Sequence, residues 1–222
     1  MEGPLVLRLA LLLPLTLFTA LPANAQVSLK SIGDTCLESD LDTCKVLTAG
    51  YFNRADYSDA EGEPLIAWQT HAGTGEYGVI GGFVLFRHSG TGWDVLDKAS
   101  DGFFQVPTFN DDNILHIPGY SQGTGVFNTD RLYRLEEDGT TWTPIDMDNW
   151  LAGVELPEGK EIWKGVTFDF SNPWSGYVAR TALWQSEDGN CCPSGGSAVI
   201  SLEIEGNTLV GKDVEYTPPA EE

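Results

Sequence analysis

Two segments of the chain repeat one pattern: LYRLEEDGTTW at residues 132–142 and VISLEIEGNTL at residues 199–209. They align without a gap, and a glycine stands at the same place in both. A version that is two residues shorter, LFRHSGTGW, occupies residues 85–93. Each copy combines a strand, a polar turn with glycine and a returning strand, and this pattern predicts a β-hairpin.

Upstream of each predicted hairpin the chain has two more short apolar segments, which are typical of strands. The six segments lie at residues 45–52, 65–70, 102–109, 113–119, 165–170 and 181–186. The strands at residues 65–70 and 181–186 also share the dipeptide Trp-Gln. Self-similarity of this kind predicts a supersecondary unit that occurs three times.

The predicted fold class is therefore all-β, with three tandem four-stranded antiparallel meanders in a propeller-like arrangement. The units lie at about residues 45–98, 102–146 and 165–216, within one domain at residues 26–216, with residues 147–164 inserted as a short helix or loop and residues 217–222 as a disordered tail. Propellers usually have about four or more blades. The alternatives are a β-sandwich or closed barrel built from the same strands, and a propeller completed by a second chain.

The first 25 residues have the features of a secretory signal peptide. Residues 5–21 are almost entirely apolar, and small residues at Ala23 and Ala25 fit the rule for signal-peptidase cleavage. A membrane anchor would need about 20 apolar residues without interruption, whereas Pro14 breaks this stretch. We expect a secreted or periplasmic protein that is not inserted in a membrane after cleavage.

The chain is strongly acidic, with 33 Asp and Glu against 12 Lys and Arg and a formal net charge of −21. Nucleic acids and anionic membrane surfaces would be repelled by this charge, so neither is an expected partner. The charge favours a basic protein, a cation or a neutral glycan that aromatic side chains approach.

The four cysteines of an exported chain predict disulfide bonds. One solution is a local bond between Cys36 and Cys44 beside a bond between the adjacent residues Cys191 and Cys192. The other joins the first segment to the second by two bonds. Adjacent Cα atoms lie about 3.8 Å apart, which is shorter than the usual separation in a disulfide. We prefer the local pairing, and the connectivity stays open.

An oxygen-rich stretch at residues 56–63 is the best candidate for a cation site. Calcium prefers six to eight oxygen ligands in a flexible loop, often with a glycine at the turn. The candidate ligands are Asp56, Asp59, Glu61 and Glu63. Their spacing matches no established calcium loop, and a solvated acidic loop is the preferred interpretation. No other cofactor is implied.

Three tryptophans stand outside the repeated framework, whereas the others occupy strand positions that are typical of core packing. These three are Trp150, Trp163 and Trp174. Exposed tryptophans flanked by carboxylates are what a glycan-binding surface would use, with ring stacking and hydrogen bonds from Asp and Asn. Burial in the core is the competing and preferred interpretation.

The sequence predicts no catalytic residue. It has no nucleophile elbow, and the Ser-Gly cluster at residues 194–197 precedes a predicted strand. The histidines His71, His88 and His116 do not have the spacing of metal ligands.

Residues 188–196, DGNCCPSGG, are followed by the predicted strand SAVISLEIEGNTLV. This segment resembles the C-terminal hairpin of a set of uncharacterised exported bacterial proteins, over about thirty residues. The resemblance implies export, a bacterial origin and a structural role for the adjacent cysteines. It implies no activity and no catalytic residue.

The leading functional hypothesis is an exported acidic all-β protein that binds a ligand or acts as a scaffold. Its presumed surface is formed by four loops, at residues 53–64, 71–82, 120–130 and 186–197. One alternative is an exported polysaccharide hydrolase with two carboxylates about 5–10 Å apart, one of raised pKa. The other is a structural component of an envelope complex, which would expose an apolar patch.

Overall fold

The structure, a computed structural model, describes residues 27–53, 64–76, 78–89, 92–123 and 126–220. The described chain is all-β, as expected from the sequence, and α1 (Leu29–Asp34) is its single α-helix. No helix within these ranges is long and apolar enough to cross a membrane. The predicted signal peptide and the proposed calcium ligands lie outside the described residues.

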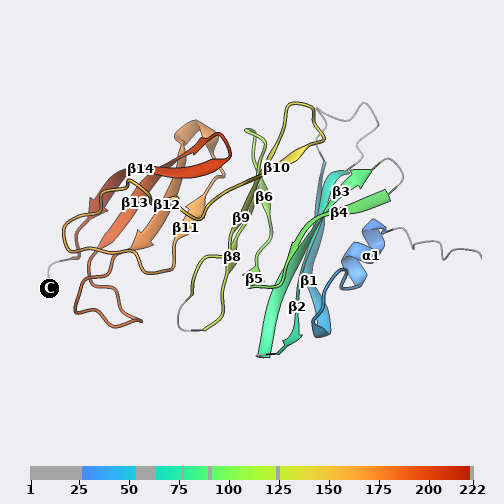
Figure 1. The fold of residues 1–222 in the computed structure, drawn as a ribbon, viewed down its shortest axis with the longest axis horizontal. Coiled ribbons are helices and arrows are strands. Elements are labelled where there is room, and N and C mark those ends of the chain that lie inside the picture. Colours follow the sequence, from blue (N-terminus) through green and yellow to red (C-terminus); the bar gives the residue numbers. More distant parts are fainter. Residues whose placement is uncertain (1–26, 54–63, 77, 90–91, 124–125, 221–222) are drawn as a thin grey trace, which may run out of the picture.

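Four antiparallel sheets contain all the strands (Figure 1). The first sheet has the order β1 (Asp42–Asn53), β2 (Pro64–Gly75), β3 (Gly78–Ser89) and β4 (Gly92–Ala99). The second sheet has the order β10 (Trp142–Ile145), β9 (Arg131–Leu135), β7 (Ile114–Ile117) and β6 (Thr108–Phe109). The third sheet has the order β11 (Thr167–Asp169), β12 (Tyr177–Ala182), β13 (Ser197–Glu205) and β14 (Thr208–Thr217). A small sheet pairs β5 (Phe103–Phe104) with β8 (Gly119–Tyr120).

Each sheet is open, with two edge strands. None of the sheets in the described ranges closes on itself, so the alternative of a closed barrel is wrong. The edge strands β10 of the second sheet and β11 of the third have only 4 and 3 residues, so they leave few backbone groups without a hydrogen-bond partner.

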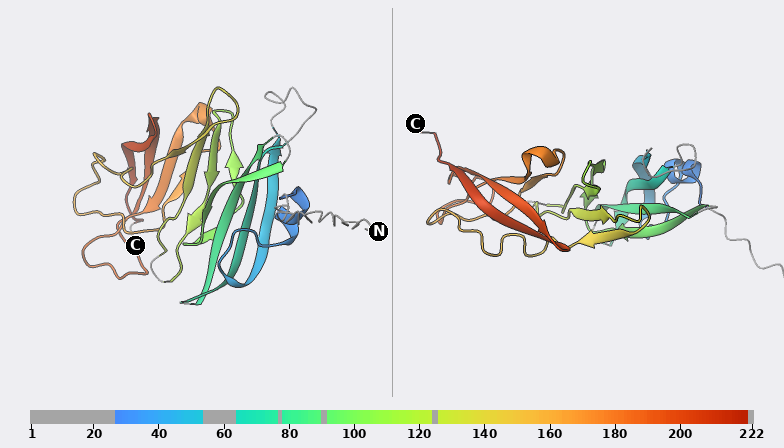
Figure 2. Two further views of the ribbon diagram at one scale, coloured as in Figure 1. Left: turned by 45° about the vertical axis from the view of Figure 1, so that its right-hand side comes forward. Right: turned by 90° about the horizontal axis from the view of Figure 1, so that it is seen from above.

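The three large sheets pack face to face in a row, and α1 covers the outer face of the first sheet (Figures 1 and 2). Side chains alternate between the faces of a strand, so the second sheet contributes to two cores. Leu115 and Tyr133 pack with residues of the first sheet. Ile114 and Leu132 pack with residues of the third sheet. The second sheet is therefore buried on both sides.

The hairpin of β2 and β3 is longer than the sequence predicted. Residues 71–82 were expected to form a loop, but they are mostly paired strand, with Gly75 opposite Gly78 at the end. The reason is the pair Gly81-Gly82, whose lack of side chains lets the adjacent strand approach closely. A Cβ on Gly82 would lie only 2.6 Å from Nε2 of His71, the residue paired with it. The predicted loop at residues 71–82 is therefore wrong.

The insert at residues 147–164 forms turns rather than a helix. It packs on the third sheet, where the carbonyl oxygen of Trp150 accepts a hydrogen bond of 2.6 Å from Gly211 N. Val154 also covers Gly211, since a Cβ at that glycine would lie 2.6 Å from Val154 Cγ2. The insert thus helps to bury the face of a terminal sheet.

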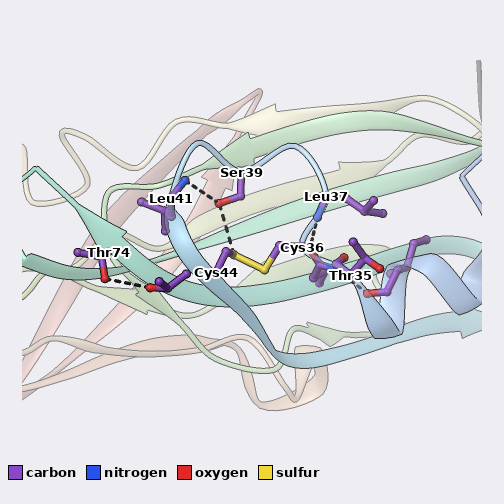
Figure 3. The surroundings of a disulfide bond; sticks show 10 residues. Thr35, Cys36, Leu37, Ser39, Leu41, Cys44 and Thr74 are labelled. Atoms are coloured by element: carbon purple, nitrogen blue, oxygen red, sulfur yellow. Dashed lines mark hydrogen bonds between the residues drawn. A yellow bond between two sulfur atoms is a disulfide. The ribbon is translucent and has the colours of Figure 1, made fainter.

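A disulfide between Cys36 and Cys44 fastens the N-terminal segment to β1, with a Cα–Cα distance of 6.1 Å (Figure 3). The buried Gln69 of β2 adds three hydrogen bonds to the same segment: its amide group donates to Ile32 O and Thr35 O and accepts from Leu37 N. These bonds satisfy backbone groups that α1 and the following turn leave unpaired.

Candidate functional site

Two open spaces lie between the second and third sheets. We call the first the joint cleft; it has a volume of about 370 Å³ and is lined by residues that include His116, Asn128, Asp130 and Asp169. We call the second the Trp174 groove; it has a volume of about 700 Å³. Its polar and aromatic lining consists of Asp111, Asp112, Asn113, Arg134, Tyr177 and Glu203.

The polar side chains of the joint cleft are bonded to one another. His116 Nε2 and Asp130 Oδ1 lie 2.6 Å apart, and both side chains are 5% exposed. Asn128 Nδ2 donates to the second oxygen of Asp130 at 3.0 Å and to Val166 O at 2.6 Å. Asn128 Oδ1 accepts from Val166 N at 3.1 Å. These bonds join the second sheet to the segment before β11, so the cleft serves as a structural joint.

The joint cleft contains two carboxyl groups, those of Asp130 and Asp169. Hydrogen bonds from the hydroxyl and the backbone N–H of Ser171 lower the pKa of Asp169 below its ordinary value. Asp169 is therefore ionised near neutral pH and holds no proton for a leaving group. Asp130 is already engaged by His116 and Asn128.

Trp174 is the most exposed aromatic side chain of the described chain, at 90%. It lies in the 3₁₀ turn Pro173–Ser175, between the groove-lining residues Pro173 and Gly176. The turn is held in place because Asn172 Oδ1 accepts a hydrogen bond of 3.1 Å from Trp174 N. An exposed indole forgoes the free energy that its burial in the core would supply. A fixed turn that exposes a whole tryptophan ring is therefore typical of a binding surface.

The walls of the Trp174 groove carry both donors and acceptors. Tyr177 OH donates to Asp112 Oδ2 at 2.7 Å, and Arg134 donates to Gly206 O at 2.9 Å. Asn113 has a left-handed backbone (φ 66°), and its buried Oδ1 has no hydrogen-bond partner in the part of the chain described. A carbonyl oxygen of this kind costs free energy until a donor satisfies it.

Burial and the hydrogen bond to Asp112 raise the pKa of Tyr177 above its ordinary value. The phenol therefore stays protonated at neutral pH and remains a hydrogen-bond donor. Asn110 Nδ2 donates to Phe170 O at 2.7 Å and to Tyr177 OH at 3.3 Å, so these bonds hold Tyr177 between the second and third sheets.

The structure separates the three tryptophans proposed for glycan binding. Trp150 is 9% exposed and packs edge-to-face on Phe168, as the preferred interpretation of burial in the core expects, so its ring is not available to a ligand. Trp163 stacks on Trp184 with a centroid distance of 5.8 Å and lies apart from the groove lining. Of these three, Trp174 is the most exposed, and the residues that flank its turn, Pro173 and Gly176, line the groove.

The remaining predicted site residues have different outcomes. Cys36 and Cys44 form the local disulfide, and a second bond joins Cys191 to Cys192. Asp56, Asp59, Glu61 and Glu63 lie outside the described residues. Within the described ranges, no three His, Cys, Asp or Glu side chains gather in a way that could hold a metal ion.

Sequence reasoning missed Asn113, Arg134 and Tyr177. Asn113 stands in the stretch FNDDN, and consecutive Asn and Asp residues are a signal for a turn with a left-handed residue. That signal marks a turn but gives no indication of the partner sheet. The three side chains meet only because two sheets pack.

The chain matches no protein-family model, no curated protein and no solved structure. The function must therefore be inferred from the geometry of the chain itself.

Proposed function

We propose that the protein is an exported binding protein that holds a neutral glycan in the Trp174 groove. The observation that carries this proposal is the 90% exposed Trp174 in a turn whose flanking residues Pro173 and Gly176 line a groove of about 700 Å³, with donors and acceptors in its walls. Sugars have an apolar ring face and a rim of hydroxyl groups. An indole covers the first, and carboxylate, amide and guanidinium groups bind the second.

The charge of the groove favours a neutral glycan over an acidic one. Asp111, Asp112 and Glu203 supply three carboxyl groups to the lining, against the single guanidinium of Arg134. An anionic glycan would also meet the net charge of −21 as it approached. A basic protein is the competing partner on charge alone, but it would not require an exposed indole.

Export is supported by the sequence and by the cysteines. The first 25 residues have signal-peptide features, and a disulfide such as Cys36–Cys44 forms in oxidising compartments. Secretion or a periplasmic location forms part of this proposal.

In this proposal the three large sheets are copies of one propeller-like unit. Gly139 and Gly206 both have left-handed backbones, with φ values of 70° and 61°, in corresponding hairpin turns. The glutamine of each shared Trp-Gln dipeptide makes hydrogen bonds to a segment outside the strands. Gln69 holds the segment around α1, and Gln185 Nε2 donates to Ser194 Oγ at 2.6 Å in the loop before β13.

An array of neutral oligosaccharides tests the proposal, with α- and β-linked glucans, mannan and chitin fragments as probes. We expect the protein to bind at least one of them and Trp174→Ala to bind it about ten-fold or more weakly. Phe127→Ala is the matched control, because Phe127 is an exposed ring (58%) whose neighbours in the chain do not line this groove. No binding by the unmodified protein, or equal losses in both variants, would contradict the proposal.

A further inference from the structure

The loop between β12 and β13 carries a disulfide between adjacent residues. Cys191 and Cys192 are bonded, their Cα atoms are 3.8 Å apart, and both side chains are exposed. Ordinary disulfides join Cα atoms about 4.4–6.8 Å apart. Because the peptide bond fixes the shorter distance, this bond closes a small ring on the surface of the protein.

The loop is held in place without this disulfide. Asp188 Oδ2 accepts hydrogen bonds of 2.8 Å from Gln185 N and from Ser194 N, and Asp188 Oδ1 accepts one from Ser194 Oγ. The hydrogen bonds from Ser194 are the main cause that lowers the pKa of Asp188 below its ordinary value. The carboxylate is therefore ionised at neutral pH and keeps accepting these bonds. Opening of the Cys191–Cys192 bond therefore leaves the base of the loop intact.

The Cys36–Cys44 bond differs in its relation to the fold. It joins residues eight positions apart, is half-buried, and fastens the N-terminal segment to β1. A disulfide that restricts the unfolded chain stabilises the folded protein, and folding in turn stabilises that disulfide against reduction. The Cys191–Cys192 bond encloses no intervening residue, so it gains little of this protection.

We propose that Cys191–Cys192 is a redox-active site, which an external dithiol reduces while the rest of the fold and the Cys36–Cys44 bond stay intact. A thiolate of the dithiol attacks one sulfur, and the other sulfur leaves as a thiolate that takes up a proton. The second thiolate of the reductant then attacks the reductant's own sulfur in the mixed disulfide, and the protein sulfur leaves as a thiolate that takes up a second proton. The protein gains two electrons and two protons, and the dithiol becomes a disulfide. The partner class is a dithiol reductant that can reach an exposed loop.

Graded reduction of the full chain, purified without reductant, tests this site. The protein is equilibrated with increasing dithiothreitol, its free thiols are alkylated, and each cysteine-containing peptide is quantified by mass spectrometry. We expect Cys191 and Cys192 to become alkylated at about one tenth or less of the dithiothreitol concentration that Cys36 and Cys44 require. Near-ultraviolet circular dichroism should remain native over that first step.

The paired substitution Cys36→Ser and Cys44→Ser provides a second measurement. If the two disulfides are independent, Cys191 and Cys192 in this variant become reduced at an unchanged dithiothreitol concentration. Three results with the unmodified protein would overturn the proposal: alkylation of Cys191 and Cys192 before any reductant is added, simultaneous reduction of both disulfides, or reduction of Cys191–Cys192 only when the circular dichroism signal is lost.

Discussion

At the scale of single residues, His71 makes the clearest prediction. Its side chain is buried (1% exposed), and neither ring nitrogen has a hydrogen-bond partner among the described residues. Burial lowers the pKa of His71 below the ordinary value of 6.5. The folded protein therefore resists protonation of this ring, whereas the unfolded chain accepts a proton readily below about pH 6.5.

The sign of the pH dependence follows from this difference. Below about pH 6.5 the unfolded chain binds more protons at this position, so the free energy of unfolding falls as the pH falls. His71→Leu removes the titrating group. We expect the free energy of unfolding of this variant to fall less between about pH 7.5 and pH 5.0 than that of the unmodified protein. Urea unfolding at about pH 7.5 and pH 5.0 measures both slopes. Equal slopes would show that His71 does not titrate between the two states.

The binding proposal also depends on single residues, and these were hard to find from sequence. Trp174 was singled out because it lies outside the repeated pattern, but Trp150 has the same property and is buried. A lone tryptophan in a loop gives no signal of its exposure. That distinction depends on the third sheet, against which the insert packs Trp150.

At the scale of elements, a hydrogen bond between side chains joins the first sheet to the second. Tyr133 of β9 donates to Asp97 of β4, and burial first, then this bond, raises the pKa of the phenol. Tyr133 is 3% exposed, so loss of its hydroxyl leaves Asp97 Oδ2 without this donor, although Asp97 Oδ1 still accepts from Lys98 N at 2.7 Å.

We expect Tyr133→Phe to lower the free energy of unfolding by about 1–3 kcal/mol, because a partly buried hydrogen bond to a charged group is lost. Tyr51→Phe is the matched control, since the ring of Tyr51 is 51% exposed. Its effect should lie within about 0.5 kcal/mol. Urea unfolding of both variants gives the comparison, and equal effects would contradict a structural role for the Tyr133 bond.

The elements show how far the sequence pattern reaches. The hairpins at residues 132–142 and 199–209 were predicted from strand, turn and glycine, and both form with glycines in left-handed conformations. Such hairpins are local, so residues near in sequence determine them. The extension of β2 and β3 past residue 70 was missed, because it depends on how closely a strand can approach Gly82.

The Trp174 groove was beyond prediction for a related reason. Its walls come from residues 111–114 and 173–177, which lie about sixty positions apart, and from β9 and β13. Their meeting depends on the packing of two sheets, and periodicity within one sheet carries no information on that contact. The sequence indicated the chemistry of the site but not its location.

At the scale of the whole molecule, the charge of −21 opposes compact folding. Like charges repel one another over the surface, and at 0.1 M salt the repulsion between charges more than about 10 Å apart is largely screened. We expect the melting temperature to rise when sodium chloride increases from about 0.02 M to about 0.2 M. A melting temperature that stays constant or falls would show that attractive ion pairs outweigh the repulsion.

Calcium at matched ionic strength separates screening from binding. A site filled at about one hundred times its dissociation constant would add about 2.7 kcal/mol to the free energy of unfolding. An additional shift with calcium that EDTA abolishes would support the cation site proposed at Asp56, Asp59, Glu61 and Glu63. An equal response to both salts would leave screening as the explanation.

The central claim is that a neutral glycan binds in the Trp174 groove, and a nuclear magnetic resonance titration tests it most directly. The probe is the neutral oligosaccharide that binds best on the array, added to ¹⁵N-labelled protein. We predict that the indole N–H signal of Trp174 and the side-chain amide signals of Asn113 shift, while the indole signals of the buried Trp68, Trp142 and Trp150 do not. Shifts confined to other residues, or no shift at saturating oligosaccharide, would contradict the account.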